Sequence, residues 1–248
     1  MIGVIGAGNM GMAIASAMKG KILLSDKNKR ISDNVSVSKR SDVIILAVKP
    51  RDIGEVLKEI KPYVKEKLII SIAAGVTTSS IEKALGKVRV IRVMPNMPAM
   101  VGKGISAVTC GRFARPDDLK TAFGIFLKVG EVTEVKENMM DAVTAVSGSG
   151  PAYYFLFTHL LAEAGGASGL EKGLAMKLAK AVFIGAAEVA ARKNLSMGEF
   201  VKKVASKGGT TEAALKVFEQ KKLGAIIKKA VKAAAHRSLS LHSDNVRV

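Results

Sequence analysis

Three glycines near the start of the chain have a spacing that can bind a phosphate. Gly6, Gly8 and Gly11 follow the apolar run Met1–Ile5 and open a helix expected over Met10–Met18. Gly6 allows a tight turn, Gly8 lets the backbone approach a pyrophosphate, and Gly11 lets the helix pack on the strand. The unpaired N–H groups at the helix N-terminus would then bind the pyrophosphate. Because a strand precedes this turn and a helix follows it, the pattern predicts a dinucleotide site rather than a plain turn.

A second candidate site is the segment Ser206–Thr211, which reads S-K-G-G-T-T. Here a glycine turn is expected to lead into a helix, with consecutive N–H groups and two threonine hydroxyls. Such a group of N–H donors suits a small carboxylate, and a threonine hydroxyl can bond a ring nitrogen. Taken alone, the segment fits a helix-capping turn better than a ligand site.

Three loops are expected to join the glycine turn at one edge of a sheet. Each follows a buried apolar run, and they are Ala47–Pro50, Ala73–Gly75 and Met94–Pro98. In open α/β sheets, ligands bind in the crevice outside the carboxyl ends of the strands. We therefore expect these loops to face one crevice, although Met94–Pro98 alone could equally be a rigid turn.

The first half of the chain alternates between strand and helix patterns, which predicts a doubly wound parallel sheet. Only sixteen residues separate Ser25 from Asp42, where such a fold normally inserts a crossover helix, so we expect a loop with at most one helical turn there. Strands are expected over 2–5, 22–24, 42–48, 68–72, 88–93, 105–110 and 131–135, and helices over 10–18 and 78–85 and from Pro50 and Pro116.

The second half, from Met139 onward, shows helical periodicity and no strand pattern. One helical face carries small and apolar side chains that a single layer cannot bury, so we expect helices of a second subunit to cover it. The domain boundary is expected between residues 136 and 137. Helices should begin at Pro151, Met197, Thr210 and Leu223, and the apolar face comprises Leu174, Leu178, Ala181, Val182, Gly185, Ala186 and Val189.

The composition narrows the class of protein. The chain has 248 residues, 48% of them apolar, which is enough for a sizeable core. No apolar stretch is as long as a membrane span and no leader precedes the first strand, so we expect a cytoplasmic enzyme. The single cysteine, Cys110, excludes an internal disulfide and is expected in the core. The histidines and carboxylates lack metal-ligand spacing, so no metal is expected.

The net charge of +18 admits two interpretations. A positive field attracts anions, whether a phosphorylated cofactor, a carboxylate substrate or nucleic acid. Between Val201 and Arg237, however, ten basic residues stand among apolar residues at helical spacing, and only 4% of the chain is aromatic. We therefore favour solvated helix faces over a nucleic-acid-binding surface.

Seven strings of the chain carry a likeness to one known family, and they are Gly6–Gly11, Ala47–Pro50, Ser71–Gly75, Met94–Pro98, Asp141–Thr144, Ser147–Tyr153 and Ser206–Thr211. Together they resemble pyrroline-5-carboxylate reductase over nearly the whole chain. The resemblance implies an N-terminal Rossmann domain over residues 1–136 and a C-terminal helical dimerisation and substrate-binding domain over 137–248. It also implies active sites at the dimer interface, and homodimers that often assemble into decamers.

The resemblance also assigns roles to single residues. Thr211 would be catalytic, with its hydroxyl near the imine nitrogen, and Glu137 would lie close to the substrate. Ser206 and Thr210 would join Thr211 in holding the substrate carboxylate. The positions matched to cofactor contacts are Gly6, Ala7, Gly8, Asn9, Met10, Gly11, Asn34, Ala47, Val48, Lys49, Pro50, Ala73, Ala74 and Gly75.

Two features bear on the choice of cofactor in opposite directions. Asp26 lies twenty positions after Gly6, where an acid accepts hydrogen bonds from a ribose hydroxyl and repels a 2′-phosphate, which favours NADH. Lys27, Lys29 and Arg30 follow and could instead pair with the phosphate, and the resemblance implies frequent use of NADPH. We expect both cofactors to work, with a slight preference for NADPH.

The activity implied is the reduction of the imine of 1-pyrroline-5-carboxylate to L-proline, the last step of proline biosynthesis. The nearest alternative is a related imine or 3-hydroxyacid reductase. Members of that group carry a catalytic lysine in the first long helix after the linker, and Pro151–Gly165 contains none. The alternative from another class is a basic nucleic-acid-binding protein.

Overall fold

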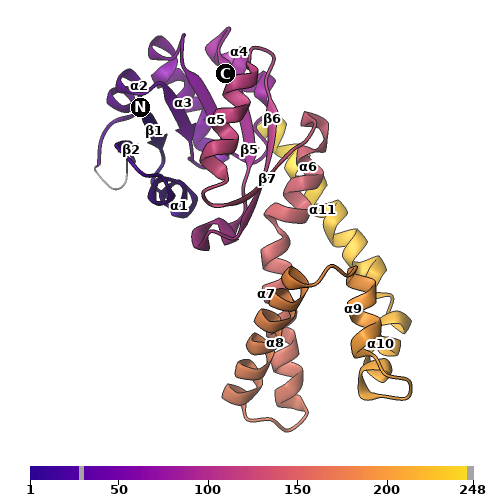
Figure 1. The fold of residues 1–248 in the computed structure, drawn as a ribbon. Helices are drawn as coiled ribbons and strands as arrows, with labels where there is room; N and C mark the ends of the chain where they lie inside the picture. The colour runs from indigo at the N-terminus through magenta and orange to yellow at the C-terminus, as the bar shows by residue number, and fades with distance from the viewer. Residues whose placement is uncertain (28–30, 245–248) are drawn as a thin grey trace. The chain divides into compact units, whose positions relative to one another are not determined.

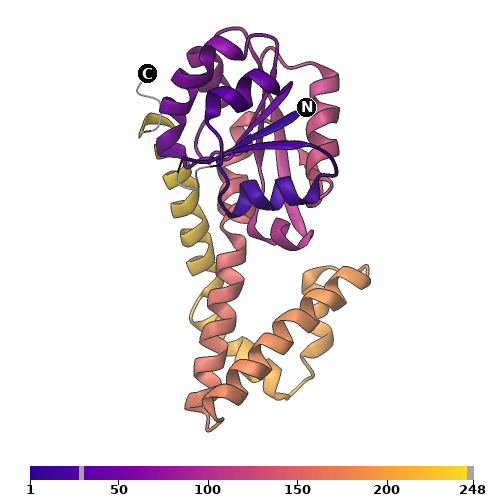
Figure 2. The same cartoon turned by 90° about the vertical axis from the view of Figure 1, so that its left-hand side faces the viewer.

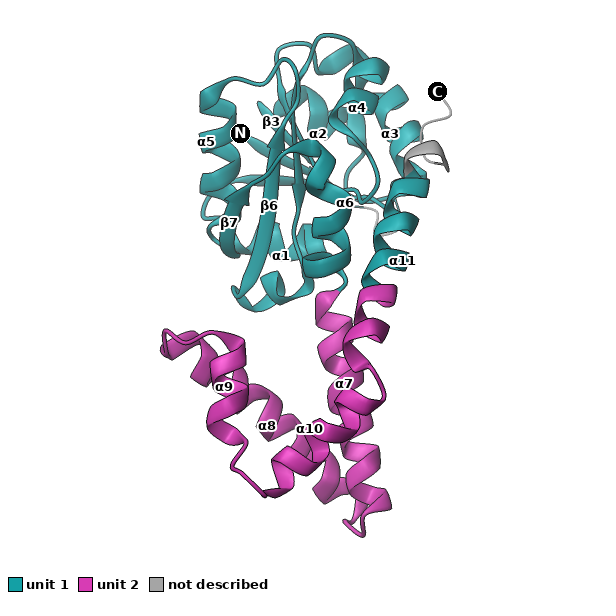
Figure 3. Ribbon diagram, turned by 90° about the vertical axis from the view of Figure 1, so that its right-hand side faces the viewer, with its two compact units in different colours: residues 1–149, 231–248 teal, residues 150–230 magenta. Residues whose placement is uncertain are grey.

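The structure is a computed structural model that describes residues 1–27 and 31–244. It divides into two compact units, shown in two colours in Figure 3. Residues 1–149 and 231–248 form the first unit, and residues 150–230 form the second. Within the described residues, no helix is both long enough and apolar enough to cross a lipid bilayer.

A seven-stranded sheet lies at the centre of the first unit, in the order β2-β1-β3-β4-β5-β6-β7 (Figure 1). The strands form where branched apolar residues follow one another. Ile44, Ile45 and Leu46 of β3 are all 0% exposed, as expected of a strand covered on both faces. The bounds are β1 Ile2–Ile5, β2 Ile22–Ser25, β3 Val43–Leu46, β4 Leu68–Ser71, β5 Arg89–Met94, β6 Gly104–Cys110 and β7 Gly130–Glu134.

The sheet is parallel except where β6 meets β5. These two strands run antiparallel, with Arg92 opposite Thr109, whereas β6 and β7 are parallel. The chain between β5 and β6 contains only the short 3₁₀ segment η3, Met97–Val101. Because a parallel return needs a crossover of about a dozen residues or more, this short connection reverses the strand direction.

Helices cover both faces of the sheet (Figure 2). On one face α1 and α5 bury Ile14 and Phe126 against the strands. On the other face α2, α3 and α4 bury Val37, Leu57 and Ile81. The predicted doubly wound α/β fold is therefore confirmed in this unit. The bounds are α1 Asn9–Ala17, α2 Asn34–Arg40, α3 Ile53–Ile60, α4 Thr78–Leu85 and α5 Pro116–Phe126, with 3₁₀ turns η1 Pro50–Asp52 and η2 Lys61–Tyr63.

The crossover between β2 and β3 is longer and more regular than the sequence suggested. Instead of at most one turn, α2 has seven residues, which is about two turns. Its start is capped by Asp33, whose carboxylate accepts a hydrogen bond from the Ser36 N–H at 2.6 Å. Val37 is 2% exposed, so the short helix gains stability from burial that composition alone did not reveal.

Lys67 closes the other end of α2. Its ammonium donates to the carbonyl oxygens of Ser38 (2.5 Å), Lys39 (3.0 Å) and Ser41 (2.5 Å), which would otherwise lack partners at the helix C-terminus. Replacing Lys67 by Met should lower the free energy of unfolding by about 2 kcal/mol, because charge-assisted hydrogen bonds are lost while the apolar stem is kept. Urea unfolding checks this. The same change at exposed Lys65 should have almost no effect, and equal effects at the two sites would refute the capping role.

Short helical segments follow β7 before the second unit begins. They are η4 Glu137–Met139, α6 Met140–Val143 and a single π-helical turn over Thr144–Gly148. The last helix, α11 Leu223–Asp244, ends in the first unit, where the buried Ser238 hydroxyl donates to Asp141 Oδ1 at 2.6 Å.

The second unit contains only helices and their connections. Phe157 packs edge-on against Phe218, and Tyr154 stacks on Phe183. The apolar face predicted on α8 is exposed, with Leu178 46% and Val182 60% exposed, so nothing within this unit covers it. The predicted helix starts are confirmed to within one residue. The bounds are α7 Gly150–Ala167, α8 Lys172–Arg192, α9 Met197–Val204 and α10 Thr210–Gln220, followed by the start of α11.

Cys110 is exposed at the end of β6, so the prediction that it is a core residue was wrong. The apolar run that contains it is buried at Val108, but its last residue lies at the strand terminus. Partial burial of the thiol, followed by repulsion from Glu134 and Asp118, raises the pKa of Cys110 above its ordinary value.

The raised pKa makes Cys110 a slow nucleophile at neutral pH, because the thiolate is the reactive form. Iodoacetamide should therefore alkylate Cys110 more slowly than a free thiol, and the rate should rise only at pH values above the ordinary thiol pKa. Glu134→Gln should lower that pKa and speed the reaction, as followed by mass spectrometry. Alkylation as fast as that of free cysteine at neutral pH would contradict this prediction.

Candidate active site

The glycine turn between β1 and α1 forms a cradle of backbone donors. Gly6 has φ +103°, and a Cβ there would lie 2.6 Å from the carbonyl oxygen of Ala47. A Cβ at Gly11 would collide with the carbonyl oxygen of Gly6, so only a glycine at this position lets α1 pack so close to the turn. In contrast, a Cβ at Gly8 would meet no atom of the described residues within 4 Å.

The N-terminus of α1 is open to an anion. Gly8 is its N-cap residue, and no side chain among the described residues caps the helix. The N–H groups of the first turn, beginning at Asn9, therefore lack intrahelical partners and carry the positive end of the helix dipole. Such a helix N-terminus suits an anion, and the dinucleotide pyrophosphate remains the ligand predicted for it.

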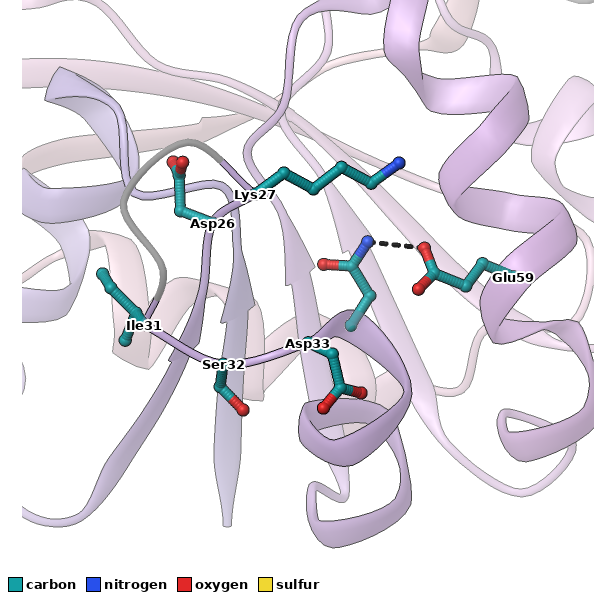
Figure 4. Close-up of a pocket in the computed structure, with 7 residues that line it drawn as sticks. Asp26, Lys27, Ile31, Ser32, Asp33 and Glu59 are labelled. Carbon is teal, nitrogen blue, oxygen red and sulfur yellow. Dashed lines mark hydrogen bonds between the residues drawn. The ribbon is translucent and has the colours of Figure 1, made fainter.

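A pocket of about 420 Å³ lies at the carboxyl end of β2 (Figure 4). Asp26 is tied to the glycine turn, because its Oδ2 accepts a hydrogen bond from the Ala7 N–H at 2.8 Å. Asn34 is 4% exposed, and its Nδ2 donates to Glu59 Oε2 at 2.7 Å, the bond drawn dashed in Figure 4. The structure thus brings three predicted cofactor residues to one pocket, which is lined by Asp26, Lys27, Ile31, Ser32, Asp33, Asn34 and Glu59.

The other predicted cofactor loops lie at the same edge of the sheet. The last residues of three strands are in register, with Ile5 beside Leu46 and Leu46 beside Ser71. Ala47–Pro50 and Ala73–Gly75 therefore follow the strands at the edge where the glycine turn lies. Lys49 is exposed and Ala73 is buried.

Contacts with other segments of the first unit hold Gly75 and the Met94–Pro98 loop in place. Gly75 has φ +71°, and a Cβ there would lie 2.5 Å from the Cβ of Leu241 in α11. Asn96 accepts a hydrogen bond from the Ile105 N–H at 2.9 Å and donates to the Ser147 carbonyl at 3.2 Å. Asn96 therefore joins the end of β5 to the π-helical turn and fixes the backbone of its loop.

Glu137, predicted to lie near the substrate, is bound to two neighbours in the first unit. Glu137 Oε1 accepts a hydrogen bond from Arg92 Nη1 at 2.7 Å, and its Oε2 accepts one from Thr78 Oγ1 at 3.2 Å. The side chain of Arg92 is 2% exposed and that of Glu137 is 32% exposed. The buried Arg92 Nη2 has no hydrogen-bond partner among the described residues. The guanidinium thus orients Glu137 and leaves part of its carboxylate exposed to solvent.

The segment Ser206–Thr211 lies in the second unit and opens α10. Gly208 has φ +73°, its N–H donates to Glu212 Oε2 at 2.6 Å, and the Gly209 N–H donates to the Ser206 carbonyl at 3.0 Å. Gly209 is the N-cap residue of α10 and supplies no side-chain cap. Two of the predicted N–H donors are thus used within the protein, which leaves the first N–H groups of the helix for a ligand.

The hydroxyls of this segment are available. In the part of the chain that the structure describes, the side chains of Ser206, Thr210 and Thr211 have no hydrogen-bond partner in the protein. Ser206 and Thr210 are exposed and Thr211 is half-buried. The segment is a turn that caps α10, as expected of it when taken alone, because Gly209 is the N-cap residue and Glu212 of the first turn accepts the Gly208 N–H. Among the described residues, the threonine hydroxyls take no part in this cap.

Sequence reasoning missed the side chains that hold these residues in place. Arg92 interrupts the apolar run of β5, and a charge within a buried strand is a signal that a partner must exist. Ser25 and Glu59, which bind Asn34, gave no such signal because single polar residues at element ends are common. No group of three His, Cys, Asp or Glu side chains among the described residues could hold a metal ion.

Comparison with known proteins matches both parts of the chain. The family model described as pyrroline-5-carboxylate reductase dimerisation matches residues 137–241, and the one described as NADP oxidoreductase, coenzyme F420-dependent, matches residues 19–75.

Individual relatives extend the match to almost the full chain. The pyrroline-5-carboxylate reductase of Methanosarcina acetivorans is 38% identical over 97% of both chains. That of Synechocystis is 42% identical over 84% of this chain and 78% of its own. The crystal structure of Plasmodium falciparum pyrroline carboxylate reductase with NADP bound has a TM-score of 0.88 and 32% identity, covering 97% of both chains. With an open glycine cradle, a strand-end crevice and relatives of this identity over nearly all its length, the chain belongs to the pyrroline-5-carboxylate reductase family.

Proposed function

We propose that the protein reduces the C=N bond of 1-pyrroline-5-carboxylate to give L-proline, with NADH or NADPH as the hydride donor. The observation that carries this proposal is the family match together with the uncapped N-terminus of α1 beside Gly8. In the balanced reaction, a hydride is added to the imine carbon and a proton ends on the nitrogen, while the reduced nicotinamide becomes oxidised.

The cofactor is proposed to lie along the edge of the sheet. Gly6–Gly11 would bind the pyrophosphate, Asp26, Lys27 and Asn34 the adenosine end, and Ala47–Pro50 with Ala73–Gly75 the remainder. The shared edge of these loops and the open space at Gly8 support these roles. A bound nicotinamide supplies the hydride, and the protein supplies its position.

The substrate carboxylate is proposed to bind Ser206 and Thr210, with the Thr211 hydroxyl at the imine nitrogen and Glu137 nearby. The unpartnered hydroxyls and the uncapped start of α10 support this assignment. A protonated imine is already a strong electrophile, so the residues need only orient it, neutralise its carboxylate and exclude water. A mechanism of this kind does not require a pair of acid–base side chains, and the sequence predicts none.

A spectrophotometric assay of cofactor oxidation separates the proposed function from its alternatives. Oxidation of NADH or NADPH should require added pyrroline-5-carboxylate and should yield proline. The rival enzyme class predicts instead that NAD⁺ or NADP⁺ is reduced by a 3-hydroxyacid, and the nucleic-acid-binding alternative predicts a salt-dependent gel shift with duplex DNA. Cofactor oxidation that does not depend on the imine, or activity with the hydroxyacid alone, would reject the proposal.

We also propose that residues 1–136 act as the dinucleotide-binding domain and residues 137–248 as the dimerisation and substrate-binding domain of a cytoplasmic homodimer, with a decamer as the higher assembly. The dimerisation match over residues 137–241 and the exposed apolar face of α8 support this organisation.

Sedimentation equilibrium at micromolar concentration should give a dimer or a multiple of it, because so large an apolar face would not stay in water. Replacing both Leu178 and Val182 by glutamate should shift the measured molecular mass toward that of the monomer. Lys177→Glu on the same helix should not. A monomeric unmodified protein would contradict this prediction.

A further inference from the structure

Asn96 holds the Met94–Pro98 loop through two hydrogen bonds of opposite polarity. Its Oδ1 accepts a bond from the Ile105 N–H at 2.9 Å, and its Nδ2 donates to the Ser147 carbonyl oxygen at 3.2 Å. Because an N–H can only donate and a carbonyl can only accept, the amide of Asn96 has a single possible orientation. Asn96 is 9% exposed, so water has little access to either bond. The position therefore requires a short side chain with both a donor and an acceptor.

The carbonyl to which Asn96 donates cannot be bonded by its own helix in the usual way. In an α-helix, a carbonyl accepts a hydrogen bond from the N–H four residues later. Four residues after Ser147 stands Pro151, which has no N–H. The Ser149 N–H reaches further back, to the Thr144 carbonyl at 2.9 Å, as expected of a π-helical turn. The side-chain amide of Asn96 thus supplies a donor in place of the missing backbone N–H.

A second contact joins the same loop to the same turn. A Cβ added at Gly148 would lie 2.7 Å from the Cε of Met94, so the side chain of Met94 can lie against the turn only because a glycine is there. Pro95 and Pro98 restrict the loop backbone further, since each proline ring fixes its own φ. The loop is therefore attached to the π-helical turn at one polar and one apolar point.

The loop follows β5 at the edge of the sheet that the proposed cofactor occupies. β5 is parallel to β4, with Arg92 beside Ser71, and it ends at Met94. In the sheet order β2-β1-β3-β4-β5, the loop lies on the side of the glycine turn that is away from β2. With the adenosine at β2 and the pyrophosphate at α1, the nicotinamide of a bound dinucleotide would extend toward the loops that follow β3, β4 and β5.

We propose that Asn96 is a positioning residue for hydride transfer, which sets the Met94–Pro98 loop at the nicotinamide end of the crevice by bonding the Ser147 carbonyl. The proposal rests on the proposed function and adds a residue to it. Asn96 acts without touching the reacting atoms, because the oxygen and the nitrogen of its amide are both bonded within the first unit. Loss of these bonds should shift the loop, and a displacement of about 1 Å can lower a rate about a hundredfold.

Asn96→Asp allows the bond to Ser147 to be switched by pH. The ionised carboxylate can still accept from the Ile105 N–H, but its second oxygen cannot donate to the Ser147 carbonyl. The protonated form carries a donor and an acceptor and can make both bonds. Burial and the facing carbonyl oxygen both disfavour the charged form, so the pKa of the new carboxyl should lie above the ordinary aspartate value of about 3.9. Lowering the pH should therefore restore the bond.

The experiment compares kcat of each variant with kcat of the unmodified protein, at saturating imine and NADH. Only conditions in which circular dichroism shows a fully folded variant are used, so a loss of stability alone would leave kcat unchanged. For Asn96→Asp the ratio should be about 0.1 or lower at about pH 8 and rise at least about threefold at about pH 6. For Asn96→Ala it should be equally low at both pH values, because alanine has no donor to restore.

Two controls accompany these variants. Asn194→Asp makes the same chemical change at an exposed residue between α8 and α9 and should leave the ratio near one. The dissociation constant of NADH, followed by its fluorescence without imine, should change less than about twofold in both Asn96 variants, because the glycine turn and the β2 pocket are intact. The choice between NADH and NADPH does not enter this test, and Lys29 and Arg30, which were predicted to influence that choice, lie outside the described residues.

A ratio near one at every pH, or a low ratio for Asn96→Asp that does not rise as the pH falls, would overturn the proposal. If Asn96→Asp is not folded at the higher pH, Asn96→Ala decides, and an unchanged kcat in that variant would overturn the proposal equally. If the unmodified protein does not oxidise NADH with the imine, the proposed function itself fails, so the two failures can be told apart.

Discussion

Replacing Thr211 by alanine should lower kcat by about a hundredfold or more and leave the fold intact, because donors to reacting groups have effects of this size. Thr211 is half-buried in the first turn of α10, and its hydroxyl has no protein partner within the described residues. No structural hydrogen bond is therefore lost, and the cost in stability should stay below about 1 kcal/mol. Steady-state kinetics with saturating imine, together with circular dichroism, measures both effects.

Two further variants separate the hydroxyl of Thr211 from its shape. Thr211→Val keeps the branched side chain without the hydroxyl and should be as slow as the alanine variant. Thr211→Ser keeps the hydroxyl and should recover most of the rate. Thr210→Ala should mainly raise KM, since Thr210 is proposed to hold the carboxylate. A folded Thr211→Ala enzyme with unchanged turnover would remove Thr211 from the mechanism.

The second large effect is expected at the pair formed by Arg92 and Glu137. Glu137→Ala should lower the free energy of unfolding by about 3 kcal/mol, because it leaves a buried guanidinium without its counter-charge. Arg92→Met should lower it much less, because Glu137 is 32% exposed and can be hydrated. The variant also removes a buried Nη2 that has no partner within the described part of the chain. Urea unfolding of the two variants and of the double variant measures this asymmetry.

The pair formed by Arg89 of β5 and Asp118 of α5 is the matched control, because its burial is reversed. The side chain of Asp118 is 5% exposed and that of Arg89 is 27% exposed. There the arginine is the more exposed partner, and removing it leaves the buried carboxylate of Asp118 without its counter-charge. Arg89→Met should therefore lower the free energy of unfolding more than Arg92→Met does. If Arg92→Met lowers the free energy of unfolding most among these variants, burial does not decide which partner of the pair matters more.

Much of the fold could be predicted because local signals agreed with one another. The prediction of a helix over 78–85 matches α4, where Thr77 caps the start and a glycine with φ +95° ends it. Pro116 begins α5 as expected, with acidic residues in its first turn. Burial of β3 could be predicted from an uninterrupted branched run.

The structure differs from the sequence predictions where contacts between residues far apart in the chain determine the local structure. The C-terminus of α2 is bonded by Lys67, which is far from it in sequence. The antiparallel direction of β6 goes with the shortness of the preceding connection. Likewise, the loops of the candidate site could be recognised from sequence, whereas the bond between Asn34 and Glu59 joins residues 25 positions apart. Spacing alone identifies which residues could bind a ligand, and only the fold shows which neighbours orient them.

The end of α11 has a consequence for how the chain can be synthesised and divided. The first unit is built from both ends of the sequence, since residues 231–248 belong to it together with residues 1–149. Leu241 packs against Gly75, and Ser238 binds Asp141, so a fragment that ends at residue 149 lacks both contacts. The nascent sheet therefore leaves the ribosome well before the segment that completes its surface, even though domains generally fold as they emerge. In topological terms, the helical unit is an insertion within the first unit.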